Sequence, residues 1–511
     1  MKGIRVLIMG VALLALYAVV MRLNIGIVQA SSLTDEEKSK IDRYIENAMS
    51  EVDFPGIVIS VVKGSETLLV KGYGYSDIGN KKKMSPNTLF EIGSNSKAFT
   101  GLGLLILEEK GMLSLDDPVK KYLPWFSLKF KGKEYEVKLS HLLYHTSGLS
   151  PNSINNVLPM QDDNALERTV RDIMKYKAIS EPGVRFTYST VNYDIIGLVI
   201  EKVSGKKYEK FMMEDVLQPL GLTKAVVGRE NSMLDDNISI GYKYGLMGNK
   251  AYNAPVYRGN TPAGYISVNG IDMARWLKIQ LQTEVVDGFP TSIIERSQKP
   301  DRSVPSNIVY PYDKPFSYAA GWLAFDGVNG LLSHGGNNPN YSSYVIISHE
   351  EKIGIAVMGN RNSSYTFGIA RAIYSILRGD EPLPPPTDIP YLVGKLSLII
   401  VILALLLAVY GGIRLVLLIR NIRNGIMIKA LNGKKSKLSA IIWLGISLLA
   451  GFVSYFFPSL LLGGYIPWSF VSVWYPDGIW IVAIAFFGGV SVFSTYRIIK
   501  AFYCKEKPLQ G

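Results

Sequence analysis

The chain has 511 residues, of which 55 are Lys or Arg and 43 are Asp or Glu, giving a formal net charge of +12. Only 19% of the residues are charged and the mean hydropathy is +0.16, which excludes an intrinsically disordered protein. The basic excess lies in the hydrophobic ends, residues 1–30 and 389–511, whereas residues 31–388 are nearly neutral. Overall charge therefore gives no support to a nucleic-acid partner, and none is expected.

Cysteine and histidine are scarce, which limits the possible chemistry. Cys504 is the single cysteine, so the main domain has no disulfide framework and no thiol nucleophile. His141 and His145 have the i, i+4 spacing that can place two metal ligands on one helix face. However, no HExxH glutamate lies between them and the next histidine is distant, so we favour structural histidines. We predict neither a metal nor a cofactor.

The N-terminus has the pattern of a secretory signal. Lys2 and Arg5 precede an apolar run over residues 6–20, and a small-residue site ends at Ala30. We predict a signal peptide over residues 1–30, cleaved after Ala30. Arg22 and the stretch after it leave an uncleaved anchor as the alternative. In both cases the domain over residues 31–380 is exported.

The C-terminal part is predicted to cross a membrane three times. A proline-rich linker over residues 381–391 leads into a region, residues 392–500, that contains three long uncharged runs. The predicted spans are residues 393–416, 438–460 and 478–498, followed by a tail over residues 501–511. Seven basic residues and no acid lie between positions 414 and 437, so the positive-inside rule places this loop and the tail in the cytoplasm. The domain over residues 31–380 is then extracytoplasmic. Buried core helices of a soluble protein are the alternative.

Hydrophobic periodicity predicts strands at both ends of the exported domain and helices in its middle. The predicted strands are residues 56–63, 66–75, 318–325, 331–336, 343–349 and 353–359. The predicted helices are residues 97–110, 165–176, 191–204, 207–216, 270–282 and 366–378. This order predicts an α+β/α fold, with an antiparallel sheet flanked by helices and an inserted helical subdomain, followed by three transmembrane helices.

Ser94 and Lys97 form the sharpest local motif. The sequence Ser94-Asn95-Ser96-Lys97 begins a predicted helix, and its i, i+3 spacing places the ammonium one turn from the hydroxyl. A desolvated lysine loses its proton more easily and can activate a serine nucleophile. Alone, the motif also fits an ordinary helix start.

Further motifs follow in a fixed order. Residues 142–149 read LLYHTSGL, residues 182–189 read PGVRFTYS, residues 262–264 read PAG and residues 334–336 read HGG. With Ser94-x-x-Lys97, this series resembles the serine β-lactamase and penicillin-binding protein superfamily, in its class C-like branch with D-aminopeptidases and esterases. The resemblance covers about residues 35–378.

The resemblance implies a role for each matching residue. Ser94 is the acylated nucleophile, Lys97 its general base and Tyr188 the phenol that relays protons. The backbone N–H groups of Ser94 and Asn337 form the oxyanion hole. The strand that carries His334, Gly335 and Gly336 lines the cleft.

Two departures from the family pattern concern the substrate. Thr190 stands where the second motif, Tyr-x-Asn, usually has its asparagine, which puts ordinary β-lactam hydrolysis in doubt. Asn337-Asn338-Pro339-Asn340 replaces a usually glycine-rich turn, and a plain turn is the alternative interpretation. The predicted substrate-binding residues are Thr190, His334, Gly335, Gly336, Asn337, Asn338 and Asn340.

An exported domain followed by three spans resembles the membrane-bound prodrug-activating peptidases of nonribosomal peptide pathways, such as the colibactin-maturing enzyme. This resemblance implies a serine peptidase that removes an N-acyl-D-Asn cap through an acyl-enzyme. A cell-wall DD-peptidase or esterase and a β-lactam-binding sensor are the alternatives. The expected partners are a small peptide-like substrate with a D-residue and the lipid bilayer, with an export transporter or a second copy of the chain as further candidates.

Overall fold

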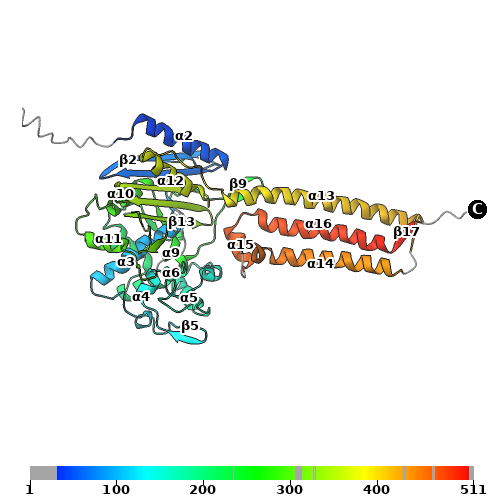
Figure 1. Ribbon diagram of the computed structural model, residues 1–511, viewed down its shortest axis with the longest axis horizontal. Helices are drawn as coiled ribbons and strands as arrows, with labels where there is room; N and C mark the ends of the chain where they lie inside the picture. The colour runs from blue at the N-terminus through cyan, green and yellow to red at the C-terminus, as the bar shows by residue number, and fades with distance from the viewer. Residues whose placement is uncertain are drawn as a thin grey trace, which may run out of the picture.

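The computed structural model describes residues 32–505, apart from 234, 305, 307–313, 326, 329, 430–432 and 463–465. A sheet with helices on both faces forms one end of the molecule, and three long helices extend from its side (Figure 1). The predicted signal peptide, residues 1–30, and the last six residues of the predicted tail lie outside the described residues.

The central sheet has eight strands in the order β11-β12-β13-β14-β15-β1-β2-β3, and every neighbouring pair that is described is antiparallel. Its strands are β1 (Gly56–Lys63), β2 (Glu66–Asp77), β3 (Lys82–Lys83), β11 (Phe316–Tyr318), β12 (Leu323–Phe325), β13 (Leu331–Asn338), β14 (Tyr341–Ser348) and β15 (Ile353–Gly359). Because β1 pairs with β15, with Ile57 opposite Gly359, the first and last long strands of the domain meet inside the sheet. The predicted fold class is confirmed.

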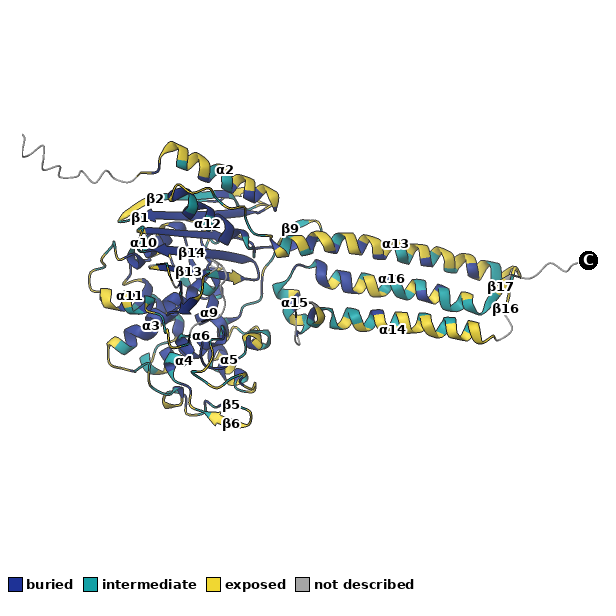
Figure 2. Cartoon of the chain, in the orientation of Figure 1, coloured by how far each residue is buried: buried dark blue, intermediate teal, exposed yellow. Residues whose placement is uncertain are grey.

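The residues of β1 alternate between two cores. Ile57, Ile59 and Val61 are buried with α2 (Asp35–Glu51) and α12 (Tyr365–Leu377), while Val58 and Val62 are buried with the larger helical core that includes α10 (Gly270–Gln280). Successive side chains of a strand point to opposite faces, so a strand covered on both faces is apolar throughout. Figure 2 shows the central strands buried and the outer face of α2 exposed.

The helical region lies on the second face of the sheet, between β4 (Phe90–Glu91) and β11 in the chain (Figure 1). Its helices are α3 (Ser96–Glu109), α4 (Leu139–Leu143), α5 (Ala165–Ile173), α6 (Val191–Ser204), α7 (Tyr208–Phe211, continued as a π-helix over Met212–Leu217), α8 (Arg229–Ser232), α9 (Thr261–Gly264), α10 and α11 (Thr291–Gln298). Short 3₁₀ turns cover Gly93–Asn95, Val119–Lys121, Pro151–Asn156 and Arg258–Asn260. The small strands are β4 (Phe90–Glu91), β5 (Leu128–Phe130), β6 (Lys133–Tyr135), β7 (Val226–Val227), β8 (Tyr242–Gly245), β9 (Gly248–Ala251) and β10 (Ile266–Val268).

The prediction of one continuous strand over residues 318–325 is wrong. Residues 318–325 form the end of β11, a reversal and β12, which pair with each other in antiparallel fashion. Gly321 has a φ of +84°, and a Cβ there would lie 2.3 Å from the backbone nitrogen of Ala98 in α3. The chain therefore turns at the one residue that tolerates both this backbone conformation and this contact.

Three helices are long and apolar enough to span a membrane, as predicted: α13 (Ile389–Arg423), α14 (Lys434–Leu462) and α16 (Gly478–Ala501). All three extend beyond the predicted spans of residues 393–416, 438–460 and 478–498. The short helix α15 (Trp468–Trp474) lies between α14 and α16 in the chain. At the far end, β16 (Met427–Lys429) pairs with β17 (Tyr503–Lys505), so the start of the predicted tail is a strand.

Glycines let α13 and α16 approach closely. A Cβ on Gly489 would lie 2.5 Å from the carbonyl oxygen of Ala404, and one on Gly411 would lie 2.9 Å from the Cα of Phe493. Small residues at such contacts are the usual means by which membrane helices pack.

The predicted linker, residues 381–391, packs against the catalytic domain. The Leu383 carbonyl accepts a hydrogen bond from Tyr44, and Pro385 and Pro386 lie against Gly368 of α12. The last three residues of this segment already belong to α13. The spans thus leave the domain from a fixed surface.

Two buried charged groups complete this junction. Arg361, two residues after the end of β15, pairs with Asp388 at 3.1 Å, and both side chains are at most 1% exposed. Lys243 on β8 donates to the carbonyl of Ser472 in α15 at 2.6 Å and pairs with Asp477 at 3.3 Å. Both groups connect the catalytic domain to the membrane helices.

Candidate active site

Ser94 lies in the 3₁₀ turn that leads into α3, at the point where the helix meets the edge of β13. Gly93, with a φ of +53°, precedes it, and a Cβ on Gly93 would lie 2.5 Å from the backbone nitrogen of Asn337. A Cβ on Gly336 would lie 1.9 Å from the carbonyl oxygen of Ile92. The two glycines therefore allow the serine turn to contact the strand directly.

Lys97 is fully buried one turn into α3. In its protonated form, its Nζ donates to Ser94 Oγ at 3.0 Å, to Thr190 Oγ1 at 2.8 Å and to the carbonyl oxygen of Ala263 at 2.7 Å. These three acceptors come from three separate segments of the chain. The arrangement holds the amine against the serine hydroxyl in a single orientation.

The electrostatics around Lys97 favour loss of its proton. Burial lowers the pKa of Lys97 well below its ordinary value, and Asp194, also buried, partly opposes this shift. Burial likewise raises the pKa of Asp194, whose carboxylate accepts a hydrogen bond from Asn260 at 2.7 Å. A neutral amine beside a hydroxyl can accept a proton, which is the requirement for a general base.

Tyr188 lies beside Ser94 in the same pocket. Its hydroxyl is buried and makes no ordinary hydrogen bond within the described part of the chain. Burial raises the pKa of Tyr188, and the neighbouring Ser94 counteracts part of the rise. Lys97 Nζ lies 5.4 Å from the centre of the tyrosine ring. The phenol therefore keeps its proton at neutral pH and is placed to donate it.

His145 supports the ring of Tyr188. The two ring centres are 4.3 Å apart, and the Nδ1 atom of His145 accepts hydrogen bonds from Asn192 at 3.0 Å and from the Ser189 N–H at 3.3 Å. Asn192 in turn accepts a hydrogen bond from Ser147 at 2.7 Å. The LLYHTSGL motif thus contributes a buried histidine that positions the tyrosine.

The geometry argues against a metal ion at His141 and His145. Helix α4 ends at Leu143, and His145 follows it with a φ of +57°, so the two histidines do not share a helix face. His141 Nδ1 accepts the backbone N–H of Lys138. No group of three or more His, Cys, Asp or Glu side chains that could hold a metal occurs in the described residues.

The HGG strand forms one wall beside Ser94. His334 donates from Nδ1 to the Gly335 carbonyl at 2.7 Å and accepts at Nε2 from Tyr318 at 3.0 Å. Burial and the neighbouring Lys97 lower the pKa of His334 to about 3, so it stays neutral. Asn337 follows on the same strand with its side chain exposed. The backbone N–H groups of Ser94 and Asn337 thus belong to segments in contact.

Of the amide side chains predicted to read the substrate, the structure places only that of Asn337 in the pocket. Asn338 is buried and donates to Glu91 at 2.7 Å and to the Gly264 carbonyl at 2.9 Å. Asn340 is buried and donates to the Tyr252 carbonyl, on the wall of a different cavity. The side chains of these two asparagines thus bind other parts of the domain and lie outside the lining of the pocket beside Ser94.

The pocket next to Ser94 has a volume of about 390 Å³ and is lined by Ser94, Tyr188, His334, Gly335, Asn337, Ser343, Ser363 and Ser364, together with an apolar group. That group consists of Phe186, Phe316, Leu323, Tyr344 and Phe367, with Thr366 beside them. The pocket thus offers hydroxyl and amide groups together with aromatic rings.

Sequence reasoning missed several functional contacts. The Ala263 carbonyl and Asp194 act on Lys97 from distant parts of the chain, and Asn192 acts on Tyr188 through its hydrogen bond with His145. The PAG motif pointed to the region of Ala263, but a backbone acceptor has no side-chain signal. Asp194 and Asn192 follow the Tyr188 motif on α6, which was the available clue.

This sheet, with a buried lysine held on a serine at the start of the first core helix, defines the β-lactamase and penicillin-binding protein superfamily. The chain belongs to it: the sequence profile of the family described as Beta-lactamase matches residues 41–378. Members of this family are serine hydrolases.

Individual relatives agree with this assignment. Protein flp of Staphylococcus aureus strain N315 is 30% identical over 481 residues, covering 92% of each chain. Penicillin-binding protein 4* of Bacillus subtilis is 26% identical over 70% of this chain and 79% of its own length. Among solved structures, the octameric penicillin-binding protein homologue from Pyrococcus abyssi matches with a TM-score of 0.60 and 28% identity, over 69% of this chain and 80% of its own. FmtA from Staphylococcus aureus matches with a TM-score of 0.55 and 25% identity, over 69% of this chain and 91% of its own.

Proposed function

We propose that the protein is a membrane-anchored serine hydrolase that cleaves D-configured amides through an acyl-enzyme on Ser94. The observation that carries the proposal is the buried Lys97 amine at 3.0 Å from Ser94 Oγ, with its pKa lowered by burial. A neutral lysine in this position can accept the serine proton as the hydroxyl attacks a carbonyl carbon. No cofactor is required for this step.

The remaining groups fit the two half-reactions. In acylation, Ser94 Oγ bonds to the carbonyl carbon, the C–N bond breaks and the leaving amine takes a proton from Tyr188, which regains one from Lys97. In deacylation, water attacks the ester, and Lys97 and Tyr188 take its proton and return one to Ser94. The N–H groups of Ser94 and Asn337 would stabilise the negative oxygen of each tetrahedral intermediate.

The pocket supports an acylated substrate with a small polar residue. The aromatic rings of Phe186, Phe316 and Phe367 suit an apolar acyl group, and Asn337 offers an amide near Ser94. This supports N-acyl-D-Asn amides as the first candidate. Because Asn338 and Asn340 point elsewhere, we expect a moderate preference for D-Asn over D-Ala, rather than exclusion of D-Ala.

The second candidate is a DD-peptidase or esterase of the cell wall. It is favoured by the name of the Bacillus subtilis relative, which states that this relative binds penicillin. Such a protein would prefer D-Ala to D-Asn and would be acylated readily by β-lactams.

A panel of substrates separates these candidates. Purified full-length protein in detergent would be given N-acyl-D-Asn, N-acyl-L-Asn, N-acyl-D-Asp and N-acyl-D-Ala amides and a chromogenic cephalosporin, with Ser94→Ala as the control. Faster cleavage of D-Asn than L-Asn or D-Asp amides, absent in Ser94→Ala, would support the first candidate. A D-Ala preference would assign the second, and cleavage by Ser94→Ala would contradict both.

We also propose that the catalytic domain is extracytoplasmic. The seven basic residues between positions 414 and 437 support this orientation through the positive-inside rule. A reporter that is active only after export is expected to be active when fused at residue 385 and inactive at residue 432. The reverse pattern would place the active site in the cytoplasm.

A further inference from the structure

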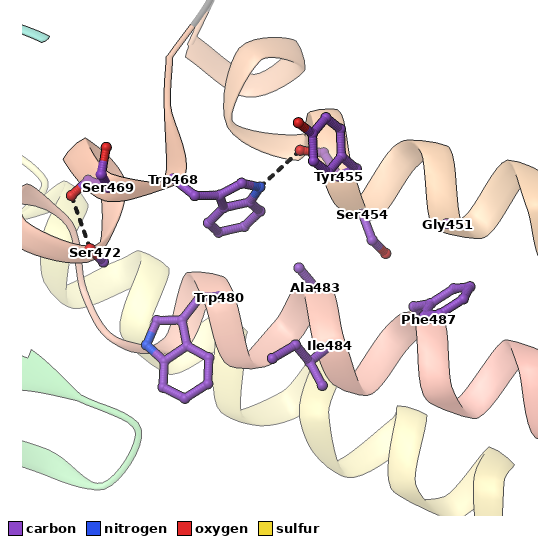
Figure 3. Close-up of a pocket in the computed structure, with 10 residues that line it drawn as sticks. All are labelled: Gly451, Ser454, Tyr455, Trp468, Ser469, Ser472, Trp480, Ala483, Ile484 and Phe487. Carbon is purple, nitrogen blue, oxygen red and sulfur yellow. Dashed lines mark hydrogen bonds between the residues drawn. The ribbon is translucent and has the colours of Figure 1, made fainter. Parts of the chain in front are cut away.

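The membrane helices border an open cavity that the hydrolase site does not use, and lining residues such as Tyr455 and Ile484 are exposed. It has a volume of about 700 Å³ and is lined by residues of α14, α15 and α16, among them Gly451, Ser454, Trp468, Trp480, Ala483 and Phe487 (Figure 3). Its size is within the range of about 300–1,000 Å³ that small-molecule sites occupy. The lining is almost entirely apolar.

The cavity exists because α14 and α16 separate toward the catalytic domain. Farther from that domain the helices touch, with the hydroxyls of Ser447 and Ser491 3.1 Å apart and the rings of Trp443 and Phe493 5.3 Å apart. Beyond these contacts, Gly451 on α14 and Ala483 on α16 are too small to fill the space between the helices. The widened gap therefore follows from residue size.

Helix α15 closes the end of this gap. The indole N–H of Trp468 donates to the carbonyl oxygen of Tyr455 at 2.9 Å, which fixes the ring across the cavity (Figure 3). Trp480 faces the same space from α16. Tryptophan and tyrosine gather where membrane proteins meet the lipid headgroups, so the cavity lies at the interfacial end of the spans.

One polar atom in the lining has no partner. The hydroxyl oxygen of Ser454 is buried and makes no hydrogen bond within the described part of the chain. Figure 3 shows this side chain directed into the gap between α14 and α16. A buried hydroxyl without a partner is unfavourable, and a bound acceptor such as an ester carbonyl would satisfy it.

Basic residues lie at the α15 end of the cavity. The carbonyl of Ser472, which belongs to the lining, accepts the hydrogen bond from Lys243. Lys243 and Lys250 share the single carboxylate of Asp477, at 3.3 and 3.2 Å. The side chains of this group leave one positive charge uncompensated. Because the Lys243 side chain is 4% exposed and that of Lys250 is 67% exposed, Lys250 is the charge that a phosphate at the membrane surface can reach.

We propose that this cavity binds one acyl chain of a glycerophospholipid. The chain would lie along the open gap between α14 and α16, its ester carbonyl would accept from Ser454, and its phosphate would face the exposed Lys250. A lipid held there would fill the gap directly below the catalytic domain. This proposal does not depend on the substrate of the hydrolase.

The test uses the quenching of tryptophan fluorescence by bromine. The full-length protein would be placed in phosphatidylcholine nanodiscs that contain increasing fractions of phosphatidylglycerol with brominated acyl chains. A defined site near Trp468 and Trp480 is expected to give quenching that saturates at a low fraction. Lipid contact without a site gives quenching that rises steadily with the fraction, and that result would overturn the proposal.

Variants identify the site. Ala483→Phe fills the cavity and should abolish the saturable component, and Ser454→Ala should weaken it roughly fivefold, the effect of one ordinary hydrogen bond. Leu448→Phe, on a side chain of α14 that is 67% exposed, is the matched control and should behave as wild type. Ser454→Ala removes a single oxygen atom and keeps the test valid if Ala483→Phe fails to fold. Unchanged quenching in Ser454→Ala would contradict the role of its hydroxyl.

Native mass spectrometry of protein released from the nanodiscs gives a second readout. We expect one added phospholipid mass on wild type and on Leu448→Phe, and none on Ala483→Phe. When the nanodiscs also contain a prenyl phosphate, retention of its mass in place of the phospholipid would show a different occupant and overturn the proposal.

Discussion

Thr190 accepts a hydrogen bond from the Nζ atom of Lys97 at 2.8 Å, so the residue that replaces the usual asparagine of the Tyr-x-Asn motif acts on the lysine. The sequence predicted that Thr190 would bind substrate, and this contact adds a second role. Tyr188 and Thr190, two residues apart, thus flank the Ser94–Lys97 pair. Position 190 therefore helps to fix the orientation of the base.

Replacement of Thr190 should reduce the rate of the chemical step. Thr190→Val keeps the shape of the side chain but removes one acceptor of Lys97, and we expect kcat to fall about tenfold, as one charge-assisted hydrogen bond predicts. Thr190→Ser should restore most of the activity. If Thr190 only contacted substrate, Thr190→Val would raise KM at unchanged kcat, and that result would remove its proposed role on Lys97.

The pH profile should report Lys97. Because its pKa is lowered from the ordinary value of 10.5, the neutral amine and therefore kcat/KM should increase as the pH rises through a value well below 10.5. Tyr188 should not produce a decrease below pH 10, since its pKa is raised. Asp194→Asn removes a charge that raises the pKa of Lys97, so the increase in kcat/KM should move to lower pH. A shift to higher pH would contradict this coupling.

Gly93 should be required for activity for a second reason besides its backbone conformation. Gly93→Ala places a methyl group 2.5 Å from the backbone nitrogen of Asn337, whereas Gly64, with a similar φ of +55°, has no atom within 4 Å of such a group. Each variant should lose about 1–2 kcal/mol of stability from the strained φ. Only Gly93→Ala should lose hydrolysis by more than a hundredfold. Equal activity in the two variants would argue against a catalytic function of the Ser94–β13 contact.

The Arg361–Asp388 pair should contribute to stability and to the pocket. Asp388→Ala leaves a buried guanidinium without its carboxylate, which costs about 3–5 kcal/mol. Asp388 also accepts a hydrogen bond from Ser363, which lines the pocket, so KM should rise. The exposed pair of Arg378 and Asp380 is the control, and Asp380→Ala should change stability by about 1 kcal/mol or less. Equal thermal unfolding of the two variants would contradict this prediction.

The sequence predicted the regular elements well where one periodicity dominated. The predicted bounds of β1, β15 and α6 agree with the structure because apolar runs end at clear turn residues, such as Gly64 after β1 and Gly205 after α6. Local patterns also located the three spans. Their true lengths were underestimated, since each helix continues past its apolar run into polar or charged residues.

Contacts between distant segments could not be predicted in the same way. Gly321 breaks a β-rich run because of its contact with α3, and the side-chain directions of Asn338 and Asn340 depend on the β13–β14 register and on partners far away in the chain. The salt bridge between Arg361 and Asp388 likewise joins two segments whose proximity exists only in the folded chain. The motifs identified which residues meet at the site but not which atoms they contact.

The central claim is that Ser94 becomes acylated. Full-length protein would be mixed with an excess of an activated N-acyl-D-amino-acid ester, quenched in acid after milliseconds to minutes and measured as intact mass, followed by peptide mapping. We predict a transient mass increase equal to the acyl group, located on Ser94, strongly reduced in Lys97→Ala and absent in Ser94→Ala. Hydrolysis without any adduct on wild type, or an adduct of equal amount on Ser94→Ala, would contradict the account.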